Sequence, residues 1–158
     1  MKHFVETQWT GKMQFNALVN GHTLILVNGH TLIMDGPEKV GGENNGPIPK
    51  PFLLTALTGC TGMDVIALLR KAGKQVSDFR LLVEGEISKE PPIEYTNIHL
   101  IYQLNGDKNL QGDVLNAITD SQERICGVSK MLKRILPLTW EILYNGEQIF
   151  CNKNGGVY

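Results

Sequence analysis

The chain has 158 residues and a formal net charge of −1, from 15 basic and 16 acidic side chains. This length fits one domain with its own hydrophobic core. A charge near zero gives no field that would gather nucleic acid or an anionic membrane surface, so neither is expected as a partner. We find no apolar run near the roughly 20 residues that span a bilayer. The opening "MKHFVETQW" also lacks the long apolar segment of a secretory signal, so we expect a cytoplasmic protein.

The N-terminal part predicts an antiparallel β-meander. Two β-rich segments, residues 2–11 and 12–19, are separated at Gly11-Lys12, and a doubled block "VNGHTLILVNGHTLIM" follows over residues 19–34. Each copy contains Asn-Gly between apolar residues, the strongest short-range signal for a hairpin. The block has the form of a tandem octapeptide duplication, and an even insertion preserves the alternation of a strand. We expect one copy to form the hairpin and the other to lengthen the strands or loop out, without a catalytic role.

The rest of the chain predicts helices and further strands. The Gly- and Pro-rich stretch 36–51 is expected to be a loop that crosses over the following helix. Apolar residues at spacings of three and four predict a long helix over 52–71, started by Pro51 and ended by Gly73. A strand pair at 79–88 and 96–104, a helical segment over 110–132 and a last strand at 138–146 complete the order. We therefore predict a single α+β domain over residues 1–150 and a C-terminal tail over 151–158.

The three cysteines, Cys60, Cys126 and Cys151, are too few for a disulfide scaffold. A buried cysteine on a helix is often an inert small hydrophobe, but Cys60 lies between two glycines that leave space beside its sulfur. Cys126 precedes a glycine at an expected break between two helical pieces, where free amides of the next turn can lower a thiol pKa. Cys151 falls in the expected tail and has no such setting. Cys60 and Cys126 are therefore the candidate redox pair.

The histidines give no comparable signal. His22 and His30 are duplicated copies, and His3 and His99 lie on expected strands, so surface or turn positions are favoured over metal ligation. No ligand set converges in the sequence pattern. We therefore predict no metal and no other cofactor.

Two segments carry a resemblance to a known family. "GGENNGPIPKPFLLTALTGCTGMDVIALLRKAGK" and, after a strand pair, "AITDSQERICGVSKML" resemble the OsmC/Ohr family of thiol-dependent hydroperoxide reductases. The resemblance implies an OsmC-like fold and an intertwined homodimer with an active site at each end of its interface. It also implies that Cys60 is the peroxidatic cysteine and Cys126 the resolving one, with organic hydroperoxides as substrates and an external dithiol as the reductant.

The chain departs from the family's peroxidase pattern before the first cysteine. Family peroxidases carry a glutamate at the start of the central helix and an arginine bound to it, whereas this chain has Lys50 and Pro51 there and no arginine before Cys60. Lys50, Lys39 and Arg124 are the candidate cations for stabilising a thiolate. Two hypotheses follow: a dithiol hydroperoxide reductase, or a non-peroxidatic module that binds a hydrophobic ligand or senses redox state at the dimer interface.

Overall fold

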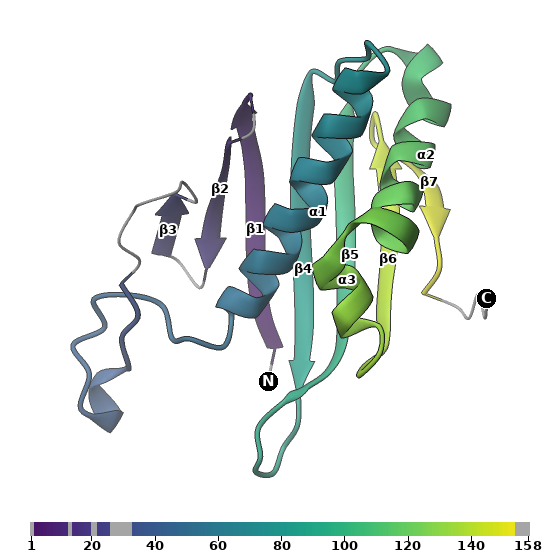
Figure 1. Cartoon of the computed structure of the whole chain (residues 1–158). Helices are drawn as coiled ribbons and strands as arrows, with labels where there is room; N and C mark the ends of the chain where they lie inside the picture. The colour runs from purple at the N-terminus through teal and green to yellow at the C-terminus, as the bar shows by residue number, and fades with distance from the viewer. Residues whose placement is uncertain (1, 13, 20–21, 26–32, 154–158) are drawn as a thin grey trace.

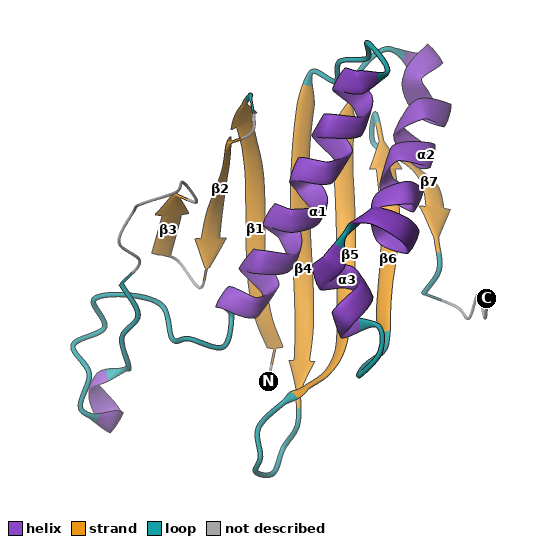
Figure 2. Ribbon diagram, viewed as in Figure 1, coloured by secondary structure: helices purple, strands orange, loops and turns teal. Residues whose placement is uncertain are grey.

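The sheet and the helices form two layers. The computed structural model describes residues 2–12, 14–19, 22–25 and 33–153, and within them one seven-stranded sheet has the order β3-β2-β1-β4-β5-β6-β7. The α-helices lie together on one side of this sheet (Figures 1 and 2). The strands are β1 (Lys2–Gly11), β2 (Gln14–Val19), β3 (His22–Ile25), β4 (Asp78–Ile87), β5 (Tyr95–Asn105), β6 (Leu138–Tyr144) and β7 (Glu147–Cys151). The predicted α+β class is confirmed.

The expected hairpin of the doubled block is present at its first copy. Strand β2 pairs antiparallel with β3, and Val19 lies opposite His22. Residues 26–32, which include most of the second copy, lie outside the described residues, so its role stays a prediction. Residues 36–51 form the expected loop, with one 3₁₀ turn at Glu38–Val40. This loop extends beside the β3 edge of the sheet and does not cross over the helix layer, contrary to the prediction (Figure 1).

Helix α1 (Phe52–Lys71) matches its predicted bounds. Gly73 adopts the left-handed conformation at φ +69°, and the Lys74 amide donates to the Leu69 carbonyl at 2.8 Å, which closes the helix end. Its length and apolar composition would suffice to cross a membrane, which the sequence analysis did not anticipate. More than half of this stretch is nevertheless buried inside the domain, as in a core helix. Its buried apolar side chains, Leu54, Leu57, Val65, Ile66 and Leu69, belong to one core with the apolar residues of the sheet.

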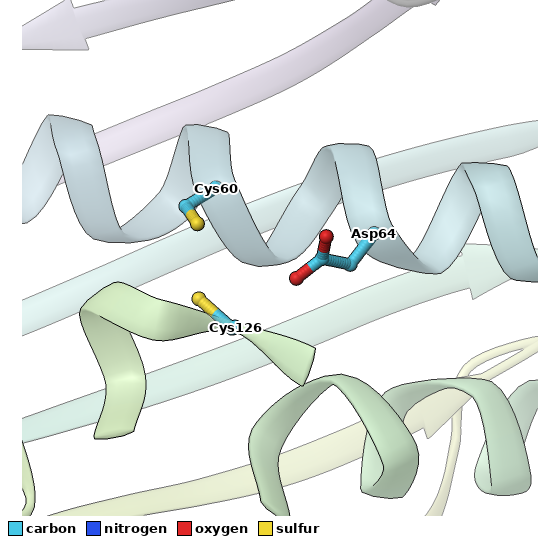
Figure 3. A group of neighbouring side chains, drawn as sticks. All are labelled: Cys60, Asp64 and Cys126. Atoms are coloured by element: carbon cyan, nitrogen blue, oxygen red, sulfur yellow. The ribbon is translucent and has the colours of Figure 1, made fainter. Parts of the chain in front are cut away.

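The second helical segment is interrupted where the sequence predicted a break. Helix α2 (Gln111–Asp120) continues into a π-helical turn over Ser121–Ile125, and α3 (Gly127–Leu132) follows. Cys126 between them is extended, with φ −67° and ψ 107°. These helices form the crossover that joins β5 to β6, which pair in parallel. The break between α2 and α3 therefore lies in the helix layer, and Cys126 in it faces α1 (Figure 3).

The C-terminal part of the domain contains a strand that was not predicted. Strand β6 ends at Tyr144, and β7 then returns antiparallel to it. Asn145 and Gly146 have φ values of 51° and 83°, and positive values at both central residues are what a tight two-residue hairpin of this type requires. Cys151, which was expected in the tail, is an exposed residue at the end of β7 and lies opposite Glu141.

The packing at Gly85 gives a test of how β4 and β5 meet α1. A Cβ at Gly85 would lie 2.5 Å from Cε1 of Tyr95 and 3.2 Å from Cδ1 of Leu54. We expect Gly85→Ala to lower the free energy of unfolding by about 1–3 kcal/mol, because both neighbours are buried and must move. The control is Gly112→Ala, where an added Cβ on α2 meets nothing within 4 Å. In urea denaturation, Gly112→Ala should be as stable as the natural chain or more stable by up to about 1 kcal/mol. Equal stability of Gly85→Ala and Gly112→Ala would contradict this packing.

Candidate active site

Two thiols and one carboxyl group converge between α1 and the break before α3. The sulfurs of Cys60 and Cys126 and a carboxylate oxygen of Asp64 all lie within 4.8 Å of one another. Cys60 and Asp64 project from one face of α1, one turn apart, and Cys126 points toward them from the other segment (Figure 3). All three cysteines of the chain are free thiols. The fold thus brings together the two cysteines selected from the sequence and leaves Cys151, which is exposed, on β7.

The break in the helical segment supplies backbone donors to both sulfurs. The Cys126 amide donates to the Ser121 carbonyl at 2.8 Å, which ends the π-helical turn and frees the first amides of α3. The Ser129 amide donates to the Cys126 sulfur at 3.4 Å, and the Val128 amide donates to the Cys60 sulfur. Amides after Cys126 therefore lie beside the sulfurs of both cysteines.

A buried hydrogen-bonded network fixes the other side of the site. The Thr61 hydroxyl lies 2.7 Å from the Tyr102 hydroxyl and 2.8 Å from that of Ser121. Ser121 donates in turn to Oδ2 of Asp64 at 3.2 Å. The Gln122 side-chain amide also donates to Tyr102, whose pKa burial raises, so the phenol stays neutral. The network therefore ties α1, β5 and the π-helical turn together around Asp64.

Burial dominates the ionisation of the site. It raises the pKa of the Cys60 thiol to about 11, and the hydrogen bond with Cys126 acts in the same direction. The Val128 amide opposes this shift by stabilising the thiolate. Burial also raises the pKa of Asp64, which the hydrogen bond from Ser121 opposes. In the single chain, Cys60 is therefore a neutral thiol at pH 7.

The three candidate cations lie elsewhere in the single chain. The Lys50 ammonium donates to the Ile93 carbonyl. The Arg124 side chain is exposed, and its Nε forms an ion pair with Asp120 at 3.3 Å. Lys39 is exposed on the 3₁₀ turn of the 36–51 loop. Among the described residues, the charged groups that shift the pKa of Cys60 are Cys126 and Asp64, and both raise it. The structure thus brings the cysteines together without these cations.

Two histidines differ from expectation. His3 and His99 are buried, not at the surface or in turns. A polar partner inside the domain makes the burial of each ring tolerable. Nδ1 of His3 lies 2.8 Å from the Tyr95 hydroxyl, and Nδ1 of His99 lies 2.8 Å from the Thr139 hydroxyl. The side chain of His22 and all of His30 lie outside what the structure describes.

An apolar groove opens at the N-terminal end of α1. Its volume is about 1000 Å³. Leu53 on this groove precedes Cys60 by seven residues, or about two helical turns, on the same helix face. The side chains that line it are Ile48, Pro49, Lys50, Leu53, Glu94, Tyr95, Thr96, Ile135 and Leu136. Cys60 and Cys126 are not among these side chains, so the groove and the thiols are neighbouring sites along α1.

Asp64 and the polar network were not identified from the sequence. The one sequence signal for Asp64 was its spacing of four residues from Cys60, which indicates a shared helix face but not a role in the site. Thr61, Tyr102 and Ser121 come from three separate elements, so their contact depends on the tertiary structure.

Comparisons with known proteins identify the family of this chain. The family model for OsmC-like protein matches residues 42–141, which include both cysteines and Asp64. Protein YhfA of Escherichia coli K12 is 30% identical over 96 residues, which cover 61% of this chain and 72% of YhfA.

Solved structures share the fold at low sequence identity. An OsmC-like protein from Mycoplasma pneumoniae has a TM-score of 0.58 at 15% identity, with 88% of this chain and 94% of that one covered. A hypothetical protein from Aquifex aeolicus has a TM-score of 0.56 at 23% identity, covering 89% and 96%. An organic hydroperoxide resistance protein OsmC from Legionella pneumophila has a TM-score of 0.55 at 13% identity, covering 88% and 95%. With the family model covering well over half of its length, the chain belongs to the OsmC-like protein family.

Proposed function

We propose that this protein reduces organic hydroperoxides with Cys60 and Cys126. The observation that carries the proposal is the approach of the two sulfurs, which come from separate elements and lie within 4.8 Å of each other. A relative with this fold, from Legionella pneumophila, is named an organic hydroperoxide resistance protein, and family membership supports a peroxide-related redox role. The apolar groove next to α1 favours a hydrophobic peroxide over hydrogen peroxide.

The proposed reaction has two steps. The Cys60 thiolate attacks the outer oxygen of R-O-O-H, the O–O bond breaks and the alcohol leaves with the thiol proton, so Cys60 becomes a sulfenic acid. The Cys126 sulfur then attacks the Cys60 sulfur, and water leaves as the disulfide forms. An external dithiol reduces this disulfide and restores both thiols. Because such dithiols and free cysteines belong to reducing compartments, we propose a cytoplasmic location.

The Val128 amide takes part of the role that the family's arginine would have. It donates to the Cys60 sulfur and so favours the thiolate against burial. This help is incomplete, because the pKa of Cys60 is still about 11. We propose that Lys39, Lys50 or Arg124 contributes a cation only after a rearrangement or from a second copy of the chain.

We also propose a homodimer. Apolar side chains stay exposed beside the groove, with Leu53 at 42% and Ile135 at 76% exposure, and a second copy would cover them. Light scattering of the reduced protein should give twice the chain mass of 17.6 kDa. A single-chain mass at micromolar concentration would contradict the dimer but not the thiol chemistry.

A second candidate function is the binding of a hydrophobic ligand without peroxide chemistry. The apolar groove favours it, together with a Cys60 whose pKa is about 11. The two functions differ in whether Cys60 and Cys126 are repeatedly oxidised and reduced.

The direct test is consumption of cumene hydroperoxide with a dithiol as reductant. We expect steady turnover by the natural chain and the uncatalysed rate for Cys60→Ser, because the attacking sulfur is gone. Cys151→Ser is the matched control, and its rate should be unchanged, because this exposed thiol is remote from the pair. Equal rates for Cys60→Ser and the natural chain would exclude the proposed reaction and leave ligand binding as the function.

The pH dependence of Cys60 alkylation tests the ionisation of the site. Burial raises the pKa of Cys60 from 9.0 to about 11, so the thiolate fraction should rise with pH throughout the neutral and mildly alkaline range. Iodoacetamide should therefore modify Cys60 about tenfold faster for each pH unit between about pH 7 and pH 9, measured by peptide mass spectrometry on reduced Cys151→Ser, which keeps Cys126 beside Cys60. A plateau below pH 9 would mean that a cation stabilises the thiolate in solution, as the dimer proposal allows and the single chain does not.

A further inference from the structure

The convergence of Cys60, Asp64 and Cys126 also has the composition of a metal site. Two sulfurs and one carboxylate oxygen form a set of ligand atoms that Zn²⁺ takes in proteins. We propose that the reduced protein binds a thiophilic divalent cation of the Zn²⁺ class through Cys60, Asp64 and Cys126, with water in the fourth position. The sequence analysis predicted no metal, because these residues converge only in the folded chain.

The spacing of the three atoms suits such an ion. Zn–S bonds of about 2.3 Å and Zn–O bonds of about 2.0–2.2 Å place the corners of a tetrahedron about 3.5–3.8 Å apart. The ligand atoms lie within 4.8 Å of one another, so closure requires movements on the order of 1 Å. Cys60 and Asp64 stand at positions i and i+4 of α1, an arrangement that directs two ligands to one ion.

The ionised form of the site favours a bound cation. When the two thiols and the carboxyl group ionise, three negative charges meet in a partly buried space. A divalent ion balances most of this charge, and coordination deprotonates a thiol directly.

Groups around the ligands hold them in orientation. Ser121 donates to Oδ2 of Asp64 at 3.2 Å, and the Thr61 hydroxyl lies 2.8 Å from that of Ser121. The amides of Val128 and Ser129 donate to the sulfurs of Cys60 and Cys126. Hydrogen bonds from such outer groups fix the orientation of metal ligands and tune their charge.

Metal binding and oxidation of the pair exclude each other. One hydroperoxide and two thiols yield one disulfide, one alcohol and one water, and the disulfide removes both thiolate ligands at once. Asp64 alone cannot retain the ion, so oxidation releases it. The metal site itself does not rest on the proposed peroxidase activity, because it requires only that the thiols be reduced.

The experiment titrates the reduced, metal-free full chain with Co²⁺, followed by displacement with Zn²⁺. We expect one Co²⁺ per chain and a thiolate-to-cobalt charge-transfer band in the near ultraviolet. Cys60→Ser and Cys126→Ser should each weaken that band and lower the affinity at least about 100-fold, whereas Asp64→Asn should lower the affinity and keep the band. Cys151→Ser is the control and should bind as the natural chain does. Circular dichroism identifies any variant that is unfolded.

The outcomes separate this inference from the proposed function. No binding of Co²⁺ or Zn²⁺ at micromolar concentration overturns the metal site, as does a band of undiminished intensity and unchanged affinity in Cys60→Ser or Cys126→Ser. Hydroperoxide consumption is measured in parallel on the metal-free protein. Turnover without metal binding overturns only the inference, and metal binding without turnover overturns only the peroxidase proposal.

Discussion

The interruption of the helix at Cys126 is the constraint on which the site depends. A continuous helix from α2 to α3 would bury the first amides of α3 in its own hydrogen bonds and would carry the sulfur along the helix surface. The extended backbone of Cys126, closed by its hydrogen bond to Ser121, instead directs the sulfur toward α1 and frees two amides for the thiols. Ser121 also contacts Thr61 and Asp64, so the same turn that makes the break attaches it to α1.

In this arrangement, burial opposes the ionisation of the Cys60 thiol. The packing that brings Cys60 and Cys126 together removes water from the sulfur and raises the pKa of Cys60 to about 11. A nucleophilic thiolate therefore needs compensation from positive charge or donors. The single chain offers the Val128 amide. On the proposals made above, the remaining compensation would come either from a cation of a second copy or from a bound divalent ion.

The sequence predicted the elements whose pattern is local. Helix α1 and the break at Cys126 follow from apolar spacing and from breaker residues, and the pairing of β4 with β5 matches its predicted strands. Strand β7 was missed although Asn145-Gly146 signals a hairpin, because the short segment after it is partly exposed. The role of Asp64 and the burial of His3 and His99 depend on partners distant in sequence, which composition and spacing do not reveal.

The central claim is that Cys60 and Cys126 act as one redox pair, and oxidation with one equivalent of an organic hydroperoxide tests it most directly. Peptide mass mapping of the full chain should then show an intramolecular Cys60–Cys126 disulfide while Cys151 stays reduced. In Cys126→Ser the same treatment should leave a trappable sulfenic acid on Cys60. Reduced Cys60 and Cys126 after exposure, or oxidation that falls equally on Cys151, would contradict the account.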